Sequence, residues 1–293
     1  MKLLYLTTLS YPSRFANRLQ VMKMAEAFSR IAGFKLFVSD TQENIDSVFE
    51  SYHVTRPFHI EKMGQSKLWP RSFWAAWKLA QKIKNEPNDA VFYIREIPLA
   101  FWMTILSKKF RSRFFFEAQS LEKFHRFFYK VVFPRARGII TTTRKKVEVI
   151  QQTLGIPSTR IHVFGNAVDL EEFQHAQPDA TLRENIPSGS KRPIVMYAGS
   201  LEKDYGIYTM IEAAKLLSDE ATFVLIGACA FDITLPNILR IERVSRREIP
   251  QYLLAADVLM APYSDKNYHI KYFSVPVKVS EYMAAGKPII ISD

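Results

Sequence analysis

Residues 274–293 combine residue types that suit a phosphate-bearing ligand. Ser274 can cap a helix, and Pro276 suits the first turn of that helix. Gly286 followed by Pro288 marks the place where the helix ends. Because the amide groups at a helix start are unpaired and carry partial positive charge, this start is a candidate phosphate site.

Lys278 and Glu281 lie three residues apart in the same segment, so a helix would place them on one face near its start. The lysine could neutralise a diphosphate, and the carboxylate could accept hydrogen bonds from ribose hydroxyls. A surface ion pair on an ordinary capped helix has the same spacing. The spacing alone therefore leaves both interpretations open.

A second candidate segment, residues 197–206, joins a predicted strand to a predicted helix. Open α/β folds bind ligands at this edge of the sheet, and Gly199 would let a ligand approach the backbone closely. Residues 8–17, after the first predicted strand, contain no glycine, and no G-x-G-x-x-G follows the first strand of either half. This absence argues against a nicotinamide dehydrogenase and a P-loop ATPase.

The elements that would position these residues alternate along the chain. Strands are predicted at residues 2–8, 35–39, 90–94, 113–116, 138–142, 161–164, 194–197, 222–226, 258–261 and 288–292. Helices are predicted at residues 18–31, 72–84, 98–108, 121–133, 144–154, 206–217, 249–255 and 276–285. This alternation predicts parallel sheets in an α/β fold.

The polar stretch 174–192 interrupts the alternation and is typical of a linker. We therefore predict a first domain at residues 1–175, a linker at 176–192 and a second domain at 193–293. The second domain ends on a strand that no helix follows to cover it, so we expect this domain to be incomplete.

Composition excludes several classes of protein. Of the 293 residues 48% are hydrophobic, which is too many for a disordered chain, and one cysteine cannot form an internal disulfide. The longest apolar run, residues 97–106, is about half of the ~20 residues that a membrane span needs. Residues 1–9 alternate like a strand and lack a cleavage site, so we expect a cytoplasmic protein.

The net charge of +11 is unevenly distributed. Residues 1–175 carry 27 Lys+Arg and 15 Asp+Glu, a net +12, whereas residues 176–293 carry 13 and 14, a net −1. Such asymmetry favours a polyanionic partner for the first half: a membrane surface, a nucleic acid or an acidic substrate. A solvated surface that is merely basic fits the same numbers.

Several blocks, in order, resemble the retaining nucleotide-sugar glycosyltransferases of the GT-B fold, the family called glycosyl transferases group 1. Gly165-Asn166-Ala167-Val168-Asp169 with Phe173 resembles the N-G-V-D-x-x-x-F run of that family. Residues 197–206 resemble the loop that opens the second domain of that family. Residues 255–258 with Pro262 resemble the stretch that precedes its nucleotide-sugar helix. The pattern Pro276-x-Lys278-x-x-Glu281-Tyr282-Met283-Ala284-x-Gly286-Lys287-Pro288 resembles its nucleotide-sugar helix.

The resemblance implies two Rossmann-like domains, the first binding an acceptor and the second a UDP-sugar or GDP-sugar. By position, Glu281 would hold the ribose, and Lys278 would lie by the diphosphate or sugar with the backbone of residues 274–277. The nucleotide-sugar residues implied are Gly199, Ser200, Lys203, Gly227, Ser274, Val275, Pro276, Lys278 and Glu281. We expect no metal, because the helix start and the lysine would supply the positive charge.

The sequence departs from the family pattern at several positions. The family has two glutamates in its last block, and the position of the first is occupied here by Phe273. The family's loop at the start of the second domain carries a phosphate-binding arginine and lysine, whose positions are occupied here by Ser200 and Tyr205. Lys203 is a possible substitute for one of them. The Pro-x-Lys-x-x-Glu-Tyr form occurs in a branch of the same family. In the first domain Glu117 is followed by Gln119 where many members have histidine, and His125 lies further along. We assign no catalytic base; the candidates are Glu117, Gln119 and Arg95.

Residues 108–137 carry nine Lys+Arg and two Glu, interleaved with phenylalanines and tyrosines. A helix with this pattern could lie in a membrane interface, and the tryptophans within residues 67–84 add to that case. A core-facing stripe with a basic outer face has the same pattern, while no motif supports single-stranded nucleic acid. The predicted membrane or acceptor patch is Lys108, Lys109, Arg111, Arg113, Lys123, Arg126, Phe127 and Lys130.

These observations lead to two hypotheses. The first is a glycosyltransferase at the inner face of the membrane that transfers a sugar, with retention, to a lipid-linked or polysaccharide acceptor in cell-envelope or exopolysaccharide synthesis. The alternative is a non-catalytic GT-B-like fragment that binds a membrane or a partner protein.

Overall fold

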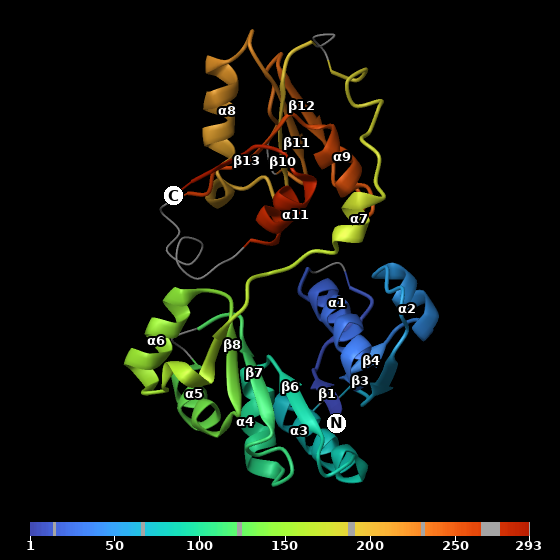
Figure 1. Cartoon of the computed structure of the whole chain (residues 1–293), viewed down its shortest axis with the longest axis vertical. Helices are drawn as coiled ribbons and strands as arrows, with labels where there is room; N and C mark the ends of the chain where they lie inside the picture. The colour runs from blue at the N-terminus through green and yellow to red at the C-terminus, as the bar shows by residue number, and fades with distance from the viewer. Residues whose placement is uncertain are drawn as a thin grey trace. The chain divides into compact units, whose positions relative to one another are not determined.

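The computed structural model describes residues 1–13, 16–65, 68–121, 125–186, 191–229, 232–264 and 276–292. The chain forms two compact units, Met1–Phe164 and Gly165–Asp293 (Figure 1). Each unit is built on one main sheet whose strands are all parallel, as the alternation of strands and helices predicts.

The first unit contains a seven-stranded parallel sheet in the order β5-β3-β1-β6-β7-β8-β9. Its strands are β1 (Lys2–Leu6), β3 (Gly33–Val38), β5 (His59–Lys62), β6 (Val91–Ile94), β7 (Phe114–Ala118), β8 (Gly138–Thr141) and β9 (Ile161–Val163). Two short strands, β2 (Ser10–Tyr11) and β4 (Asp40–Thr41), pair separately. Its helices are α1 (Ala16–Ile31), α2 (Ile45–Ser51), α3 (Arg71–Lys82), α4 (Ile97–Leu106), α5 (Arg126–Val132) and α6 (Arg144–Leu154).

Both faces of this sheet are buried. Successive side chains of a strand point to opposite faces. In β1, accordingly, Leu4 and Leu6 pack in a core with residues of α3 to α6, whereas Leu3 and Tyr5 pack in a core with residues of α1 and α2. This two-sided burial explains why the central strands are continuously apolar.

The second unit contains a five-stranded parallel sheet in the order β12-β11-β10-β13-β14. Its strands are β10 (Ile194–Ala198), β11 (Thr222–Ile226), β12 (Ile238–Ile241), β13 (Val258–Ala261) and β14 (Ile289–Ile291). Its helices are α7 (Leu170–Gln174), α8 (Ile207–Leu216), α9 (Ile249–Ala255) and α11 (Val277–Ala285). All five residues of β11 are buried, as expected for a central strand.

The boundary between the units lies earlier than the sequence suggests. Residues 165–175 belong to the second unit, where Phe173 of α7 is buried together with Leu182 and Ile186 from the predicted linker. These apolar side chains fix an otherwise polar stretch to the core. Because residues 165–175 carry three acidic and no basic residues, the first unit has 27 − 12 = +15 and the second 13 − 17 = −4.

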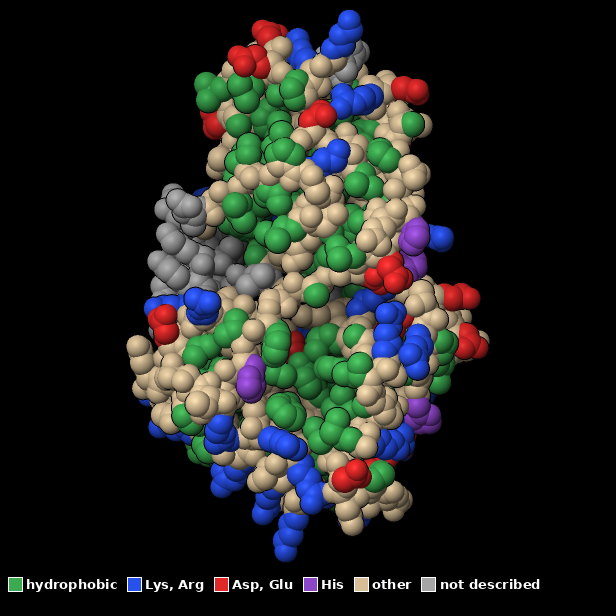
Figure 2. All heavy atoms as spheres, viewed as in Figure 1, with side chains coloured by type: hydrophobic (Ala, Val, Ile, Leu, Met, Phe, Trp, Pro, Cys, Tyr) green, Lys and Arg blue, Asp and Glu red, His purple; other side chains and the backbone are tan. Residues whose placement is uncertain are grey.

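The charge asymmetry is also visible on the surface. Lys and Arg side chains gather at the lower end of the first unit in the view of Figure 2. Within the described ranges, no helix is both long enough and apolar enough to cross a bilayer.

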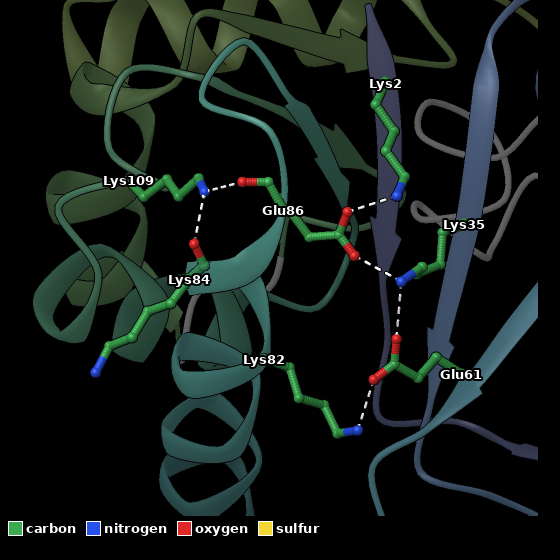
Figure 3. A network of polar contacts seen from close by, with 7 residues as sticks. All are labelled: Lys2, Lys35, Glu61, Lys82, Lys84, Glu86 and Lys109. Atoms are coloured by element: carbon green, nitrogen blue, oxygen red, sulfur yellow. Dashed lines mark hydrogen bonds and ion pairs between the residues drawn. The ribbon is translucent and has the colours of Figure 1, made fainter.

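A network of ion pairs joins β1, β3, β5 and α3 in the first unit (Figure 3). The Glu86 carboxylate accepts hydrogen bonds from Lys2 and Lys35, each at 2.6 Å. Lys35 also donates to Glu61 at 3.0 Å, and Lys82 donates to Glu61 at 2.6 Å. Burial by itself would raise the pKa of Glu86, but the hydrogen bonds from the two lysines outweigh it and hold this pKa below its ordinary value.

We expect Glu86→Gln to destabilise the first unit by about 1–3 kcal/mol at neutral pH, because Lys2 and Lys35 lose a charged acceptor. Since the pKa of Glu86 is lower in the folded state, its contribution is present above roughly pH 4.3 and is lost as pH falls through the folded value. The variant should therefore lose less stability than wild type on acidification. Denaturant unfolding at pH 7 and at a series of values from pH 4 down to pH 2 measures both effects.

The matched control is Glu148→Gln, because Glu148 is half exposed and pairs only with its helical neighbour Lys145 among the ion pairs described. This substitution should leave the midpoint of denaturant unfolding unchanged. Equal effects of the two substitutions would contradict the role assigned to Glu86.

Candidate functional site

The loops that follow β10 and β11 run side by side at the carboxyl edge of the second unit's sheet. The Gly199 amide donates to the Ile226 carbonyl at 2.9 Å, and the Leu201 amide donates to the Ala228 carbonyl at 3.2 Å. Gly227 has φ +143°, and a Cβ there would lie 2.0 Å from the Gly199 carbonyl oxygen. The close approach of these two loops therefore requires glycine at position 227.

Lys278 reaches this loop pair from the first turn of α11. Its Nζ donates to the Tyr197 hydroxyl and lies 3.9 Å from the centre of the Tyr197 ring. The rings of Tyr205 and Tyr263 lie 5.1 Å and 5.4 Å from the same nitrogen. A Cβ at Gly199 would lie 2.6 Å from Lys278 Nζ, so the ammonium group lies directly against the Gly199 backbone.

The surroundings of Lys278 change its protonation. Burial lowers the pKa of Lys278 to about 7, against the opposing effect of Glu281. Burial also raises the pKa of Tyr197 and Tyr263 well above the ordinary value, so both phenols are neutral. Near neutral pH the lysine is thus poised between its two forms, and a neighbouring anion would favour the charged one.

Glu281 lies one turn further along α11 and is only 7% exposed. Its Oε1 lies 2.5 Å from Nη1 of Arg246, in an ion pair that was not predicted from the sequence. The next residue, Tyr282, accepts a hydrogen bond from the Ala198 amide at 3.0 Å, which fixes α11 to the end of β10. This contact sets the positions of both Lys278 and Glu281.

The other predicted residues of the second unit are placed as follows. The Ser200 carbonyl accepts a hydrogen bond from the Tyr197 hydroxyl at 2.8 Å. Lys203 is exposed at the start of the short 3-10 helix Lys203–Tyr205, and Pro276 immediately precedes α11. Ser274 and Val275 lie outside the described residues, as does Phe273. Among the described residues, no group of three or more His, Cys, Asp or Glu side chains is placed to hold a metal ion.

The first unit brings its three candidate residues to the carboxyl edge of its sheet. Glu117, 3% exposed at the end of β7, accepts a hydrogen bond from the Tyr93 hydroxyl at 3.1 Å and contacts the Gln119 side-chain amide. Arg95 follows β6; burial by itself would lower its pKa, but Glu117, Tyr5 and Tyr93 together outweigh that effect and raise it. The buried carboxylate is therefore compensated by a guanidinium group.

Lys146 is the fourth member of this cluster and was not predicted from the sequence. Its Nζ donates to the Gln119 carbonyl and to the Thr142 hydroxyl, both at 2.7 Å. Burial lowers the pKa of Lys146 to about 8, against the opposing effect of Glu117. A lysine with such a pKa can exchange a proton with a substrate hydroxyl. In the sequence only its place in the first turn after β8 distinguishes Lys146, and partly exposed Lys145 shares that turn.

The predicted basic patch is divided in the structure. Lys109 donates to the Lys84 carbonyl, Arg111 to the carbonyls of Thr104 and Ile105, and Arg113 to that of Asn88. These cations, with exposed Lys108, lie in the turn between α4 and β7 at the amino edge of the sheet. Arg126, Phe127 and Lys130 are exposed on α5, which starts at the opposite edge, and Lys123 lies outside the described residues. The described members of the predicted patch therefore do not form one surface.

Comparison with known families agrees with this architecture. The model of Glycosyltransferase Family 4 matches residues 20–172, which is more than half of the chain. The chain belongs to this family. The model of Glycosyl transferases group 1 matches residues 192–293. This segment contains β10, α11 and the loops with Gly199 and Gly227, which we call the two glycine loops. The resemblance drawn from the motif blocks is thus confirmed.

Individual proteins are similar to this family member over parts of their length. The N,N'-diacetylbacillosaminyl-diphospho-undecaprenol alpha-1,3-N-acetylgalactosaminyltransferase of Campylobacter jejuni is 26% identical over 179 residues, covering 56% of this chain and 44% of that protein. The D-inositol 3-phosphate glycosyltransferase of Xylanimonas cellulosilytica is 25% identical over 172 residues, covering 52% and 40%. The matches thus span less than half the length of either relative.

A solved structure shows the same fold. The crystal structure of Anabaena Alr3699/HepE in complex with UDP superposes with a TM-score of 0.71 at 15% identity, covering 99% of this chain and 80% of that one. The predicted α/β class with two Rossmann-like domains of GT-B type is confirmed.

Proposed function

We propose that this family member transfers a sugar from a UDP-sugar or GDP-sugar to a lipid-linked or polysaccharide acceptor, with retention, in cell-envelope or exopolysaccharide synthesis. Membership of a glycosyltransferase family supports the reaction type. The name of the Campylobacter jejuni relative, which specifies an undecaprenol-diphosphate acceptor, supports the acceptor class. We place the reaction in the cytoplasm, at the inner face of the membrane.

The observation that carries the donor half of this proposal is the position of Lys278. The family pattern has cationic residues in the loop where this chain has Ser200 and Tyr205. Lys278 reaches that loop from α11 and lies against Tyr205 and Gly199. The lysine therefore brings from the helix a positive charge to the place where the loop has Ser200 and Tyr205.

We assign this charge to the departing diphosphate. Transfer breaks the bond between the anomeric carbon and the diphosphate oxygen, and negative charge grows on the leaving group as the bond breaks. A preorganised cation stabilises that developing charge most strongly in a buried site. The amide groups at the start of α11 add to the same effect.

Glu281 is assigned to the ribose. Its buried carboxylate can accept hydrogen bonds from ribose hydroxyls, while Arg246 holds one of its oxygens in place. In the first unit, the cluster of Glu117, Gln119, Arg95 and Lys146 is assigned to the acceptor. There the acceptor hydroxyl would form the new glycosidic bond and pass its proton to the neutral form of Lys146.

The proposal is tested with a panel of nucleoside diphosphates and nucleotide sugars. We expect the nucleotides of one nucleobase, uracil or guanine, to raise the midpoint of thermal unfolding. The sugar donor that carries the same nucleotide should be slowly hydrolysed in the absence of acceptor. Because the diphosphate is assigned to Lys278 and α11, EDTA should not reduce hydrolysis. No protection by any nucleotide would contradict the proposal and favour the non-catalytic alternative.

A further inference from the structure

All four tryptophans of the chain lie on or beside two adjacent helices of the first unit. Trp74 and Trp77 are on α3, Trp69 precedes α3, and Trp102 is on α4. α3 packs against α4, and α4 packs against α5 (Figure 1). The indole rings are thus concentrated on one side of the first unit.

The rings form a continuous series across the three helices. Along α3, Trp77 contacts Trp74 and Trp74 contacts Phe73, with ring centres 6.2 Å and 5.3 Å apart. The series crosses to α4 through Trp102, 5.1 Å from Phe73, and continues to Phe101 at 5.0 Å. It reaches α5 through Phe127, 5.9 Å from Phe101. We call these six residues and Trp69 the aromatic row.

Helix packing accounts for only part of the aromatic row. Phe101 is buried, but Trp77 is 46% exposed, Phe127 66% and Trp69 88%. Leu68 beside Trp69 is also exposed. Exposed rings at both ends of a connected aromatic series indicate an interaction surface, since large exposed apolar patches are rare on soluble proteins.

The charged side chains on the three described helices α3, α4 and α5 have one sign. The helices α3, α4 and α5 contain no Asp or Glu, and exposed Arg71, Arg126 and Lys130 flank the exposed rings. Indole rings favour the boundary between headgroups and acyl chains, and arginine and lysine favour anionic headgroups. Protein interfaces are also enriched in Trp and Arg. The absence of carboxylates over three helices matches an extended anionic surface better.

We propose that the aromatic row docks the first unit on an anionic lipid bilayer, with Trp69, Trp77 and Phe127 entering the interface and Arg71, Arg126 and Lys130 contacting headgroups. This surface keeps Arg126, Phe127 and Lys130 of the predicted basic patch. It leaves out Lys109, Arg111 and Arg113, which are engaged with backbone carbonyls elsewhere. It adds a docking surface to the proposed function but does not depend on nucleotide binding by the second unit. The two can therefore fail separately.

Intrinsic fluorescence tests the proposal without a label, because every tryptophan belongs to the aromatic row. Vesicles of phosphatidylglycerol and phosphatidylcholine should shift the emission to shorter wavelength, and brominated acyl chains should quench it. Vesicles of phosphatidylcholine alone should bind at least about tenfold more weakly. No spectral change and no co-sedimentation with anionic vesicles would overturn the proposal.

Variants locate the surface. Trp69→Ser, Trp77→Ser and Phe127→Ser combined should weaken vesicle binding about tenfold or more. The control combines Ile31→Ser and Leu216→Ser, which remove residues that are 80% and 82% exposed elsewhere, and it should bind like wild type. Unchanged binding by the triple variant would refute the assignment.

Two further measurements distinguish membrane docking from misfolding of the variant and from nucleic-acid binding. Far-UV circular dichroism and thermal unfolding without ligand should be the same in wild type and the triple variant, which shows that the first unit, where the substitutions lie, is folded. A single-stranded oligodeoxynucleotide should not bind in a way that depends on the three aromatic residues. If it does, the surface is a nucleic-acid site and the membrane proposal is wrong.

Discussion

Replacing Lys278 by methionine is expected to lower the rate of sugar transfer by about 10²- to 10³-fold without unfolding the chain. Methionine has a similar length and is apolar, so it fits the position among Tyr197, Tyr205 and Tyr263. It cannot stabilise the charge that develops on a leaving diphosphate. Initial rates at saturating donor and acceptor measure the loss.

The control for this substitution is Lys215→Met on α8. Lys215 is exposed and pairs with Glu212 on the same helix, so its loss should leave the rate unchanged. A Lys278→Met variant that transfers sugar at the wild-type rate would refute the role assigned to Lys278.

Lys278 should also make donor affinity depend on pH. Burial lowers its pKa to about 7, so the lysine is protonated below that pH and increasingly neutral above it. A diphosphate favours the protonated form, and above pH 7 binding must therefore take up a proton. The affinity for a nucleotide sugar should fall by up to about tenfold per pH unit above 7, and this slope should be absent in Lys278→Met.

Gly227→Ala is expected to destabilise the second unit by roughly 3 kcal/mol or more and to abolish nucleotide binding. The new Cβ would lie 2.0 Å from the Gly199 carbonyl oxygen, on a backbone with φ +143°. Because the obstacle is backbone, the two loops must separate. Thermal unfolding of the second unit should shift down by roughly 10 °C or more.

Gly286→Ala tests whether backbone conformation alone causes that effect. Gly286 has φ +66° at the end of α11, and a Cβ there meets no atom within 4 Å. We expect a cost of only about 1 kcal/mol and retained nucleotide binding. Loss of binding in both glycine variants would show that the loop contact is not the cause.

The fold was largely predictable because buried parallel strands and helices have distinct hydrophobic patterns. The predicted bounds of β11, α6 and α9 agree with the structure. Strands that were not predicted include β5 and β12, each at the end of its sheet. An edge strand is only partly buried and short, so its apolar signal is weak. The short helices α2 and α7 were missed for a similar reason.

The location of the candidate site could be proposed where its residues share one segment. Capping and spacing place Lys278 and Glu281 together near a helix start, and the family resemblance implies their roles, which stay a prediction. Their partners could not be found this way, since Tyr197 lies 81 residues before Lys278 in the chain. Arg246 likewise reaches Glu281 from another segment. Side chains that meet only through the sheet topology leave no local pattern.

Every functional assignment made above for the second unit requires that this unit binds a nucleoside diphosphate. The ligand would lie against Lys278 and the two glycine loops. Calorimetric titration of the whole chain with UDP and with GDP, in wild type and Lys278→Met, measures this binding. We expect a single site for one of the two nucleotides in wild type, with affinity at least about tenfold lower in the variant. Binding of neither nucleotide by wild type, or equal affinity in both proteins, would contradict the assignment.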